Sequence, residues 1–449
     1  MMRIAILMGL LAAAPLAAQD VSLPHTLFTL PNGLTVIVHE DDSAPIAAVN
    51  VWYHVGSGYE EPGRTGFAHL FEHIMFEGSG NVPEGEFDRL LEGAGGVNNG
   101  STSPDRTNYY EMVPANAVEL ALWLEADRMG NLLETMTQQK LDIQREVVKN
   151  ERRQSYENRP YGMYFETVFA ALYPQGHPYS WSTIGSMEDL SAASLDDVES
   201  FFRRYYSPNN AALVVAGDVD TEEIRRIAAR FFGWIPRGDE VRKPDLPVPA
   251  IPETRYITLE DRVTLPQLNL AWRAEPFYAE NDAALDALAQ ILSTGKNSRL
   301  FRRLIYDEQI AQDVLAFNNS QLLSGDFFIR ITGREDLDLN RLETAVLEEI
   351  RRIAETPPAP AELERVINGI ETNFVSSLER ALGKADQLNQ YYYYTGEPDF
   401  AAEDLARYRS LTPADVQAAA RDYLLNESRI VISIVPQGRT ELAAEGVGR

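Results

Sequence analysis

The feature that most constrains the fold is a passage that occurs twice in the chain. Residues 196–217, DDVESFFRRYYSPNNAALVVAG, resemble residues 414–435, ADVQAAARDYLLNESRIVISIV, at a shift of 218 positions. In this register Tyr205 matches Tyr423. A repeat of about 200 residues indicates two domains of the same fold, because the units of solenoid proteins are far shorter.

A segment of linker composition lies between the two copies. Residues 236–255 read PRGDEVRKPDLPVPAIPETR and are rich in proline and charge. We therefore expect an N-terminal domain over 19–238, a linker over 239–255 and a homologous C-terminal domain over 256–449. Both halves mix strand-like and helical stretches. The predicted fold class is α+β, with two homologous domains that are each a mixed, mostly antiparallel β-sheet covered by long helices.

Hydrophobic periodicity and turn residues predict the local elements. Two strands are expected on either side of the Pro-Asn-Gly turn at 31–33. The other expected strands are 46–58, 211–219 and 256–272, and the expected helices are 84–93, 115–130, 138–157, 194–206, 221–232 and 282–308.

The N-terminus has the layout of a secretory signal peptide. Arg3 precedes an apolar run from Ile4 to Leu16, and the small residues Ala17 and Ala18 follow. Residues 1–18 are thus predicted to be a signal peptide, with an uncleaved anchor or a buried helix as alternatives. No other stretch is apolar enough for stable membrane insertion. We expect an exported protein that is periplasmic, or alternatively secreted.

Composition excludes several classes of function. The chain has 67 acidic and 40 basic side chains and a net charge of -27, so a nucleic acid partner is excluded. Basic peptides would be favoured as ligands, although solubility explains such a charge equally well. The chain has no cysteine, which excludes disulfides, thiolate zinc ligands and thiol nucleophiles.

Residues 69–73 read HLFEH. On a helix His69 and His73 project one turn apart, so both imidazoles can reach one metal ion. Glu72 lies beside them and can polarise a metal-bound water without being a ligand. The apolar residues of this helix gather on the opposite side: Phe67, Leu70, Phe71, Ile74 and Met75. The alternative is an ordinary solvated helix face, and the H-x-x-E-H string alone does not decide between the two.

A catalytic zinc needs three protein ligands and an open position, so a third ligand must come from elsewhere. Glu151 is a candidate because it follows Val147 and Val148 by one turn on the apolar stripe of the predicted helix 138–157, and a buried carboxylate needs a partner. The alternative is a surface glutamate or an ion pair with Arg145. The remaining histidines lie in strands or loops and are expected to be structural: His25, His39, His54 and His177.

At this point the chain resembles the inverzincin metallopeptidases of the pitrilysin and insulysin type, and most closely the short, mitochondrial-processing-peptidase-like members. Six strings in the family's order carry the resemblance, which spans nearly all of the expected mature chain: LPNGLTVIVHE, GSGYEEPGRTGFAHLFEHIMFEGSGNV, VNNGSTSPDRTNYY, REVVKNERR, YPQGHPYSWSTIGSMEDL and YYSPNNAALVVAGDVD. The resemblance implies a zinc endopeptidase for short or unfolded peptides, with one zinc ion per chain. It implies His69, His73 and Glu151 as zinc ligands and Glu72 as general base.

The resemblance also assigns neighbouring positions. Family members usually carry a second glutamate one heptad before the third ligand, and here that position is Gln144; Glu146 is a nearby carboxylate that could substitute. Asn99 and Gly100 match the edge strand on which family members bind substrate, with glycine in place of the usual alanine. The alternative for this segment is a plain turn.

The second domain lacks the zinc motif. A shift of 217 places Asp286, Ala289 and Gln290 on the motif positions. Family second domains often supply an arginine and a tyrosine that hold substrate, and the matching positions here are Ile305 and Gln312. We therefore expect a homologous partner subunit that supplies this pair in a heterodimer.

Two alternatives to this reading stay open. A homodimer would use Arg302, Arg303 or Tyr306, which lie close to the positions of the missing pair. A non-catalytic structural or chaperone-like subunit of a larger complex is the alternative function.

Overall fold

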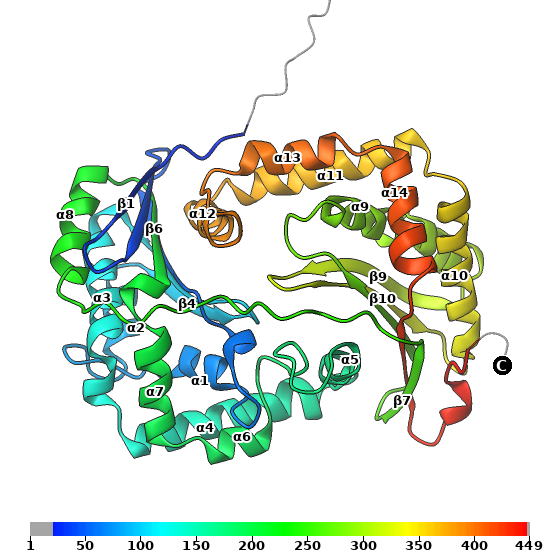
Figure 1. The fold of residues 1–449 in the computed structure, drawn as a ribbon, viewed down its shortest axis with the longest axis horizontal. Helices are drawn as coiled ribbons and strands as arrows, with labels where there is room; N and C mark the ends of the chain where they lie inside the picture. The colour runs from blue at the N-terminus through cyan, green and yellow to red at the C-terminus, as the bar shows by residue number, and fades with distance from the viewer. Residues whose placement is uncertain (1–20, 447–449) are drawn as a thin grey trace, which may run out of the picture.

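The computed structural model describes residues 21–446 of the 449-residue chain, so the predicted signal peptide lies outside the described residues. Two β-sheets stand at opposite sides of the molecule, each with its own helices (Figure 1). We call residues 21–232 the N-half and residues 255–446 the C-half. Among the described residues, no helix is both long and apolar enough to cross a bilayer.

The N-half contains a six-stranded sheet of order β1-β2-β6-β3-β5-β4. Its strands are β1 (Thr26–Thr29), β2 (Thr35–Glu40), β3 (Ile46–Tyr53), β4 (Val97–Thr102), β5 (Thr107–Pro114) and β6 (Ala211–Gly217). Its helices are α1 (Phe67–Ile74), α2 (Glu86–Gly93), α3 (Val118–Thr135), α4 (Gln138–Arg152), α5 (Tyr164–Leu172), α6 (Met187–Ala192), α7 (Leu195–Tyr205) and α8 (Thr221–Phe232).

The C-half contains a five-stranded sheet of order β7-β11-β8-β10-β9. Its strands are β7 (Arg255–Asp261), β8 (Gln267–Ala274), β9 (Ala311–Ser320), β10 (Gly325–Gly333) and β11 (Ile430–Pro436). Its helices are α9 (Asp282–Ser293), α10 (Leu339–Glu355), α11 (Pro360–Ser377), α12 (Ala381–Thr395), α13 (Ala401–Arg409) and α14 (Pro413–Ala419).

The predicted fold class is confirmed. In each sheet one strand pair is parallel, β2 with β6 and β11 with β7, and the other pairs are antiparallel. The passage that repeats in the sequence forms the same unit twice, α7 followed by β6 and α14 followed by β11. β6 is buried along its whole length because helices cover both faces of its sheet, which explains its continuous apolar run.

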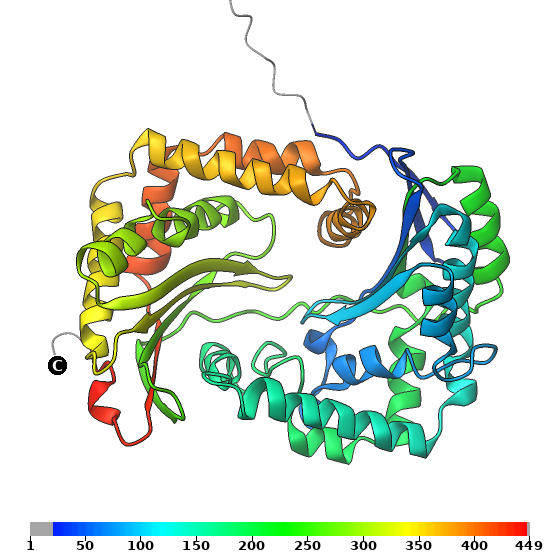
Figure 2. The same cartoon turned by 180° about the vertical axis from the view of Figure 1, so that it is seen from behind.

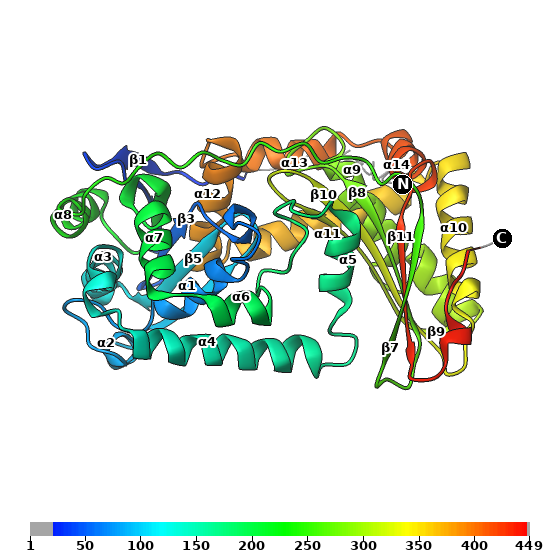
Figure 3. The ribbon, with the colours of Figure 1, turned by 60° about the horizontal axis from the view of Figure 1, so that its bottom comes forward.

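The two halves exchange one helix each. α5 comes from the N-half, but Tyr164 and Val168 pack on the C-half sheet with Ile432. α12 comes from the C-half, but Ala385 and Leu388 pack on the N-half sheet, where they contact a cluster of buried residues: Leu23, Ile37, Ala48, Val214 and Ala216. Figure 2 shows α12, in orange, against the N-half sheet, and Figure 3 shows α5 beside the strands of the C-half. Each half therefore completes the core of the other.

Several predicted elements differ in extent from the observed ones, and three of these differences have a clear local cause. The expected strand 256–272 is two strands, β7 and β8, with a break that ends at Pro266, which has no backbone N–H to donate. The expected helix 282–308 is interrupted: α9 ends at Ser293, Gly295 adopts a φ of 81°, which stops a helix, and a π-helical segment follows over Phe301–Asp307. The expected helix 138–157 is α-helical to Arg152 and then widens into one π-helical turn.

Candidate metal centre

Helix α1 is fixed at its first turn by a buried carboxylate. Gly66 precedes the helix with a φ of 87°. The Glu60 carboxylate accepts hydrogen bonds from the backbone N–H of Gly66 at 3.0 Å, from the N–H of Ala68 at 2.8 Å and from the Trp181 indole at 3.0 Å. A carboxylate at this end also complements the helix dipole. These contacts fix the first turn of α1, and none of them involves the polar side chains of the helix.

The two faces of α1 separate as the periodicity predicts. The apolar residues are buried in the N-half core: Phe67, Leu70, Phe71 and Ile74. His69, Glu72 and His73 lie on the other face and are partly accessible. This face is turned toward the C-terminal end of α4 and toward the edge strand β4, which both contact α1.

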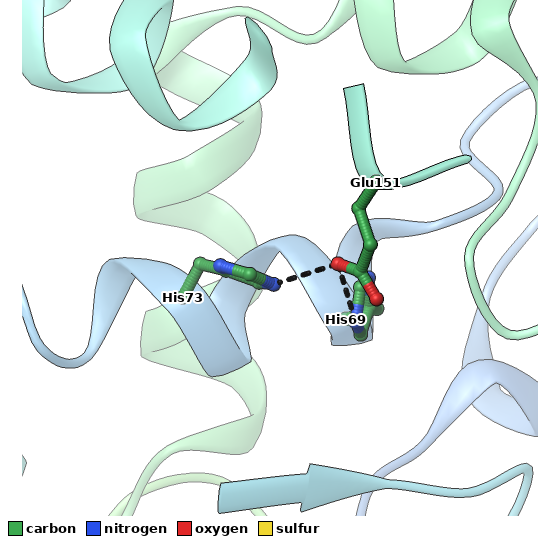
Figure 4. A group of neighbouring side chains, drawn as sticks. All are labelled: His69, His73 and Glu151. Atoms are coloured by element: carbon green, nitrogen blue, oxygen red, sulfur yellow. Dashed lines mark ion pairs between the residues drawn. The ribbon is translucent and has the colours of Figure 1, made fainter. Parts of the chain in front are cut away.

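Glu151, at the end of α4, meets both histidines of α1 (Figure 4). Its Oε2 lies 3.6 Å from Nε2 of His69 and 3.3 Å from Nε2 of His73. Of the two valines that indicated burial, Val148 is buried and Val147 is 41% exposed. Glu151 therefore lies at the margin of the buried stripe, which leaves its carboxylate accessible to a ligand.

The three side chains fit a zinc ion. Within residues 21–446, His69, His73 and Glu151 form the single group of three or more potential ligands whose donor atoms all lie within 4.8 Å of one another. Atoms bonded to a tetrahedral zinc at about 2.0–2.1 Å lie about 3.3 Å apart, close to the separations found here.

The protonation states also suit a metal. The hydrogen bond with His73 lowers the pKa of Glu151, and burial lowers the pKa of His69. Both shifts favour the deprotonated forms that bind metal ions.

The other histidines have structural surroundings. His25 and His39 each pair with a backbone carbonyl, of Leu23 and Pro24. Burial lowers the pKa of His54 to about 3 and that of His177 to about 4, so both rings are neutral at physiological pH. None of the four belongs to the group of potential metal ligands.

Glu72 lies beside the three potential ligands and is oriented by β4. Oγ1 of Thr102 donates a hydrogen bond of 2.6 Å to Oε2 of Glu72. A Cβ atom added at Gly100 would lie 3.1 Å from Cγ of Glu72, so the glycine leaves room for this side chain. Sequence reasoning missed Thr102; its one signal was its place two residues after Gly100, on the same face of a strand.

The edge strand has one free side. Among the strands of residues 21–446, β4 pairs only with β5, and it lies at the end of the sheet. Asn99 is exposed, and its Oδ1 accepts a hydrogen bond of 2.8 Å from the backbone N–H of Gly100. The segment is a strand and not the plain turn that was the alternative.

The two side chains expected around the ligands have different surroundings. Gln144 is buried, and its amide donates a hydrogen bond of 2.6 Å to Oε1 of Glu77. Glu146 points to solvent and pairs with Lys149 at 2.6 Å, so it does not replace the missing carboxylate. The carboxylate that lies near Gln144 is Glu77, and burial raises its pKa. Sequence reasoning missed Glu77 because it follows α1 in the chain and does not lie on α4.

The C-half has no metal group at the matching place. Asp286 accepts hydrogen bonds from the Tyr408 hydroxyl at 2.7 Å and the Asn318 amide at 3.2 Å. Ala289 is buried, and Gln290 is partly exposed. The side chains at these three positions are thus apolar, amide or paired within the protein.

The two positions that match the substrate-binding arginine and tyrosine of other family members lie in different surroundings. Ile305 packs against the C-half core, and Gln312 is exposed on β9. Nearby, Tyr306 is 74% exposed, whereas Arg303 is held in ion pairs with three glutamates: Glu308, Glu348 and Glu349.

Comparison with known proteins identifies the family. The model described as Insulinase (Peptidase family M16) matches residues 35–185, and the model described as Peptidase M16 inactive domain matches residues 192–370. The chain belongs to the M16 peptidase family. The resemblance to pitrilysin and insulysin is thereby confirmed, and the inactive-domain match includes the positions where the C-half lacks the motif.

Several M16 relatives cover nearly the whole chain. It is 29% identical to the zinc protease PqqE of Helicobacter pylori over 434 residues, which are 94% of this chain and 95% of that protein. It is 25% identical to the probable mitochondrial-processing peptidase subunit beta of Arabidopsis thaliana over 430 residues, 92% of this chain and 79% of that protein. The crystal structure of a protease from Helicobacter pylori matches with a TM-score of 0.87 at 27% identity, over 93% of this chain and 100% of that one.

Proposed function

We propose that this chain is a zinc-dependent endopeptidase that hydrolyses short or unfolded peptides. The convergence of His69, His73 and Glu151 on one point, with Glu72 beside them, carries the proposal. Three protein ligands with room for a fourth are the ligand set of catalytic zinc. Relatives that are named zinc proteases support the same activity.

Different parts of this chain have different roles in hydrolysis. Zinc bound at this site would lower the pKa of a water molecule and polarise the scissile carbonyl. Glu72, which is not one of the ligands, takes the proton from that water and delivers it to the leaving amine. The free side of β4 binds the peptide as an added strand. Strand addition recognises backbone more than side chains, which suits broad peptide specificity.

One substitution separates binding of zinc from chemistry. Glu72→Gln should bind one zinc per chain, as the unchanged chain does, and lose cleavage of an unstructured fluorogenic peptide. Metal content and peptide cleavage are measured on the same preparation. Cleavage retained by this variant would refute Glu72 as the base, and a chain without zinc would refute the metal centre.

We further propose that a homologous partner subunit supplies an arginine and a tyrosine to the substrate site. Ile305 and Gln312, at the matching positions, cannot do this: the first has no donor, and the second is no phenol. A relative is itself named as a subunit, of the mitochondrial-processing peptidase. The alternative is a homodimer that uses the exposed Tyr306. Full cleavage activity of the purified chain alone, compared with a mixture with the homologous chain from a neighbouring gene, would refute the partner.

We also propose that the protein is exported and acts in the periplasm. The basic, apolar and small-residue order of residues 1–18 supports this proposal. Mass spectrometry of the protein from the periplasmic fraction should find a first residue just after position 18. An intact N-terminus on a cytoplasmic protein would refute export.

A further inference from the structure

The backbone of β4 presents alternate residues to its free side. The N–H of Ser103 donates to the carbonyl of Arg106 at 2.9 Å, which fixes which residues of β4 bond to β5. In an antiparallel pair the pattern alternates, so Ser101 and Asn99 turn their backbone groups to β5. Gly100 and Thr102 turn theirs to the free side, where an added peptide strand would pair.

The same two positions of β4 also face Glu72 on one side of the sheet. At Gly100 the direction of a Cβ atom leads to Cγ of Glu72, 3.1 Å away. At Thr102 the hydroxyl donates to Oε2 of Glu72 at 2.6 Å. Within residues 21–446 this is the one hydrogen bond that the Glu72 carboxylate accepts from a protein group, so Oε1 remains available to a small molecule.

We propose that Thr102 is a positioning residue for Glu72 in peptide hydrolysis. Its hydroxyl holds Oε2 and leaves Oε1 without a hydrogen bond from a described protein group. A β-branched side chain on a strand has few rotamers, so the donor is itself held in place, and a hydroxyl-to-carboxylate bond is among the stronger hydrogen bonds.

Thr102 lies on β4, the strand that is proposed to bind the peptide. The strand that would pair with the peptide backbone is also the strand that orients the base. Peptide and base are therefore placed relative to each other by one rigid element, which favours a reactive geometry. This inference rests on the proposed peptidase function.

The test uses three variants of the full mature chain loaded with zinc. Thr102→Val keeps the shape of the side chain and removes the donor, and Thr102→Ser keeps the donor. Thr135→Val is the matched control, because the Thr135 hydroxyl, at the end of α3, bonds to the backbone carbonyls of Gly78 and Leu132 and not to Glu72. Zinc content and thermal unfolding are measured for each variant. Acetohydroxamate, a small zinc chelator whose own hydroxyl can donate to the base, serves as a binding probe without turnover.

Thr102→Val should lower kcat by about 10- to 100-fold at unchanged KM, because a hydrogen bond to a charged group is lost. It should weaken acetohydroxamate binding about tenfold or more. Zinc content and unfolding temperature should stay unchanged. Thr102→Ser should restore both kcat and binding, and Thr135→Val should resemble the unchanged chain.

Two results would overturn the proposal. One is a Thr102→Val chain with unchanged kcat and acetohydroxamate affinity. The other is a loss of activity that follows a loss of zinc or of folded protein, because the role would then be structural. If the unchanged zinc-loaded chain cleaves no peptide, with or without its partner, the peptidase function fails, and acetohydroxamate affinity still decides whether Thr102 positions Glu72.

Discussion

Both halves place a helix beside an edge strand, but the polar side chains of that helix are accessible in the N-half and paired within the protein in the C-half. In the N-half, α1 exposes two imidazoles and a carboxylate beside β4, whose outer side is open. In the C-half, α9 packs against β9, and Asp286 is satisfied by Tyr408 and Asn318. Polar groups that pair with one another leave nothing for a ligand. The two halves thus differ in whether these polar groups are paired within the protein or left accessible to a ligand.

The edges of the two sheets differ in the same way. On β9, the N–H of Gln321 donates to the carbonyl of Ser324, so by alternation Ala316 faces the free side. The Ser293 hydroxyl, at the end of α9, accepts from the N–H of Ala316 at 2.8 Å and donates to its carbonyl at 3.2 Å. On β4 no other element covers the outward backbone of Gly100 in this manner within the described residues; only the side chain of Asn99 bonds to it.

The largest effect is expected from removing one of the potential zinc ligands of the N-half. His73→Ala should lose zinc and lower cleavage by about three orders of magnitude or more, because two ligands do not hold a catalytic zinc. The matched variant in the C-half is Gln290→Ala, which should change neither. Metal analysis and a peptide assay compare the two. A zinc-free Gln290→Ala chain, or an active His73→Ala chain, would contradict the contrast between the halves.

The next effect tests the helix exchange. Leu388 is fully buried on α12, and Leu388→Ala should cost about 2–5 kcal/mol of unfolding free energy. Because α12 covers the N-half sheet, the cost should appear as faster amide hydrogen exchange in β6. Leu342→Ala, in the core of the C-half, is the comparison and should leave exchange in β6 slower than Leu388→Ala does. Equal exchange in the two variants would show that α12 does not stabilise the N-half.

The exchange of α5 and α12 also marks the limit of what the sequence predicts. Periodicity correctly separated the buried face of α1 from the face with His69 and His73, since both depend on residues within two turns. It could not predict which sheet an amphipathic helix covers, because the periodicity of α12 depends on its own residues and not on the distant strands that it contacts. The Thr102 contact with Glu72 joins residues 30 positions apart and follows only from the packing of β4 on α1.

The C-half should respond to pH through Asp286, which matches a position of the zinc motif in the N-half. Burial and the neighbouring Asp282 raise the pKa of Asp286 to about 7, and Arg407 and Tyr408 also face this cluster. Between about pH 4 and pH 7 the folded chain keeps a proton that the unfolded chain has released. Stability therefore falls as pH rises through this window. The contribution of three pKa units is at most about 4 kcal/mol.

Asp286→Asn removes this titration, so urea unfolding of the variant should depend less on pH between pH 4 and pH 7 than that of the unchanged chain. Asp313→Asn, at an exposed aspartate on β9, is the control and should keep the original dependence. If Asp286→Asn and the unchanged chain lose stability in parallel across the window, Asp286 is not the group that titrates.

The smallest effect concerns the covered edge. Ser293→Ala leaves the N–H and carbonyl of the buried Ala316 without their hydroxyl partner and should cost about 1–2 kcal/mol, the usual penalty for unpaired buried groups. An uncovered edge strand also pairs readily with other chains, so the variant should self-associate at high concentration. Urea unfolding and light scattering measure the two effects.

Ser376→Ala, at an exposed serine on α11, should show neither. Zinc content should stay at that of the unchanged chain in both variants, because the open edge of β4 and the covered edge of β9 belong to different sheets. A stable, monomeric Ser293→Ala chain would mean that the serine is not what closes β9, and the contrast between the edges would then rest on the buried side chains of α9 alone.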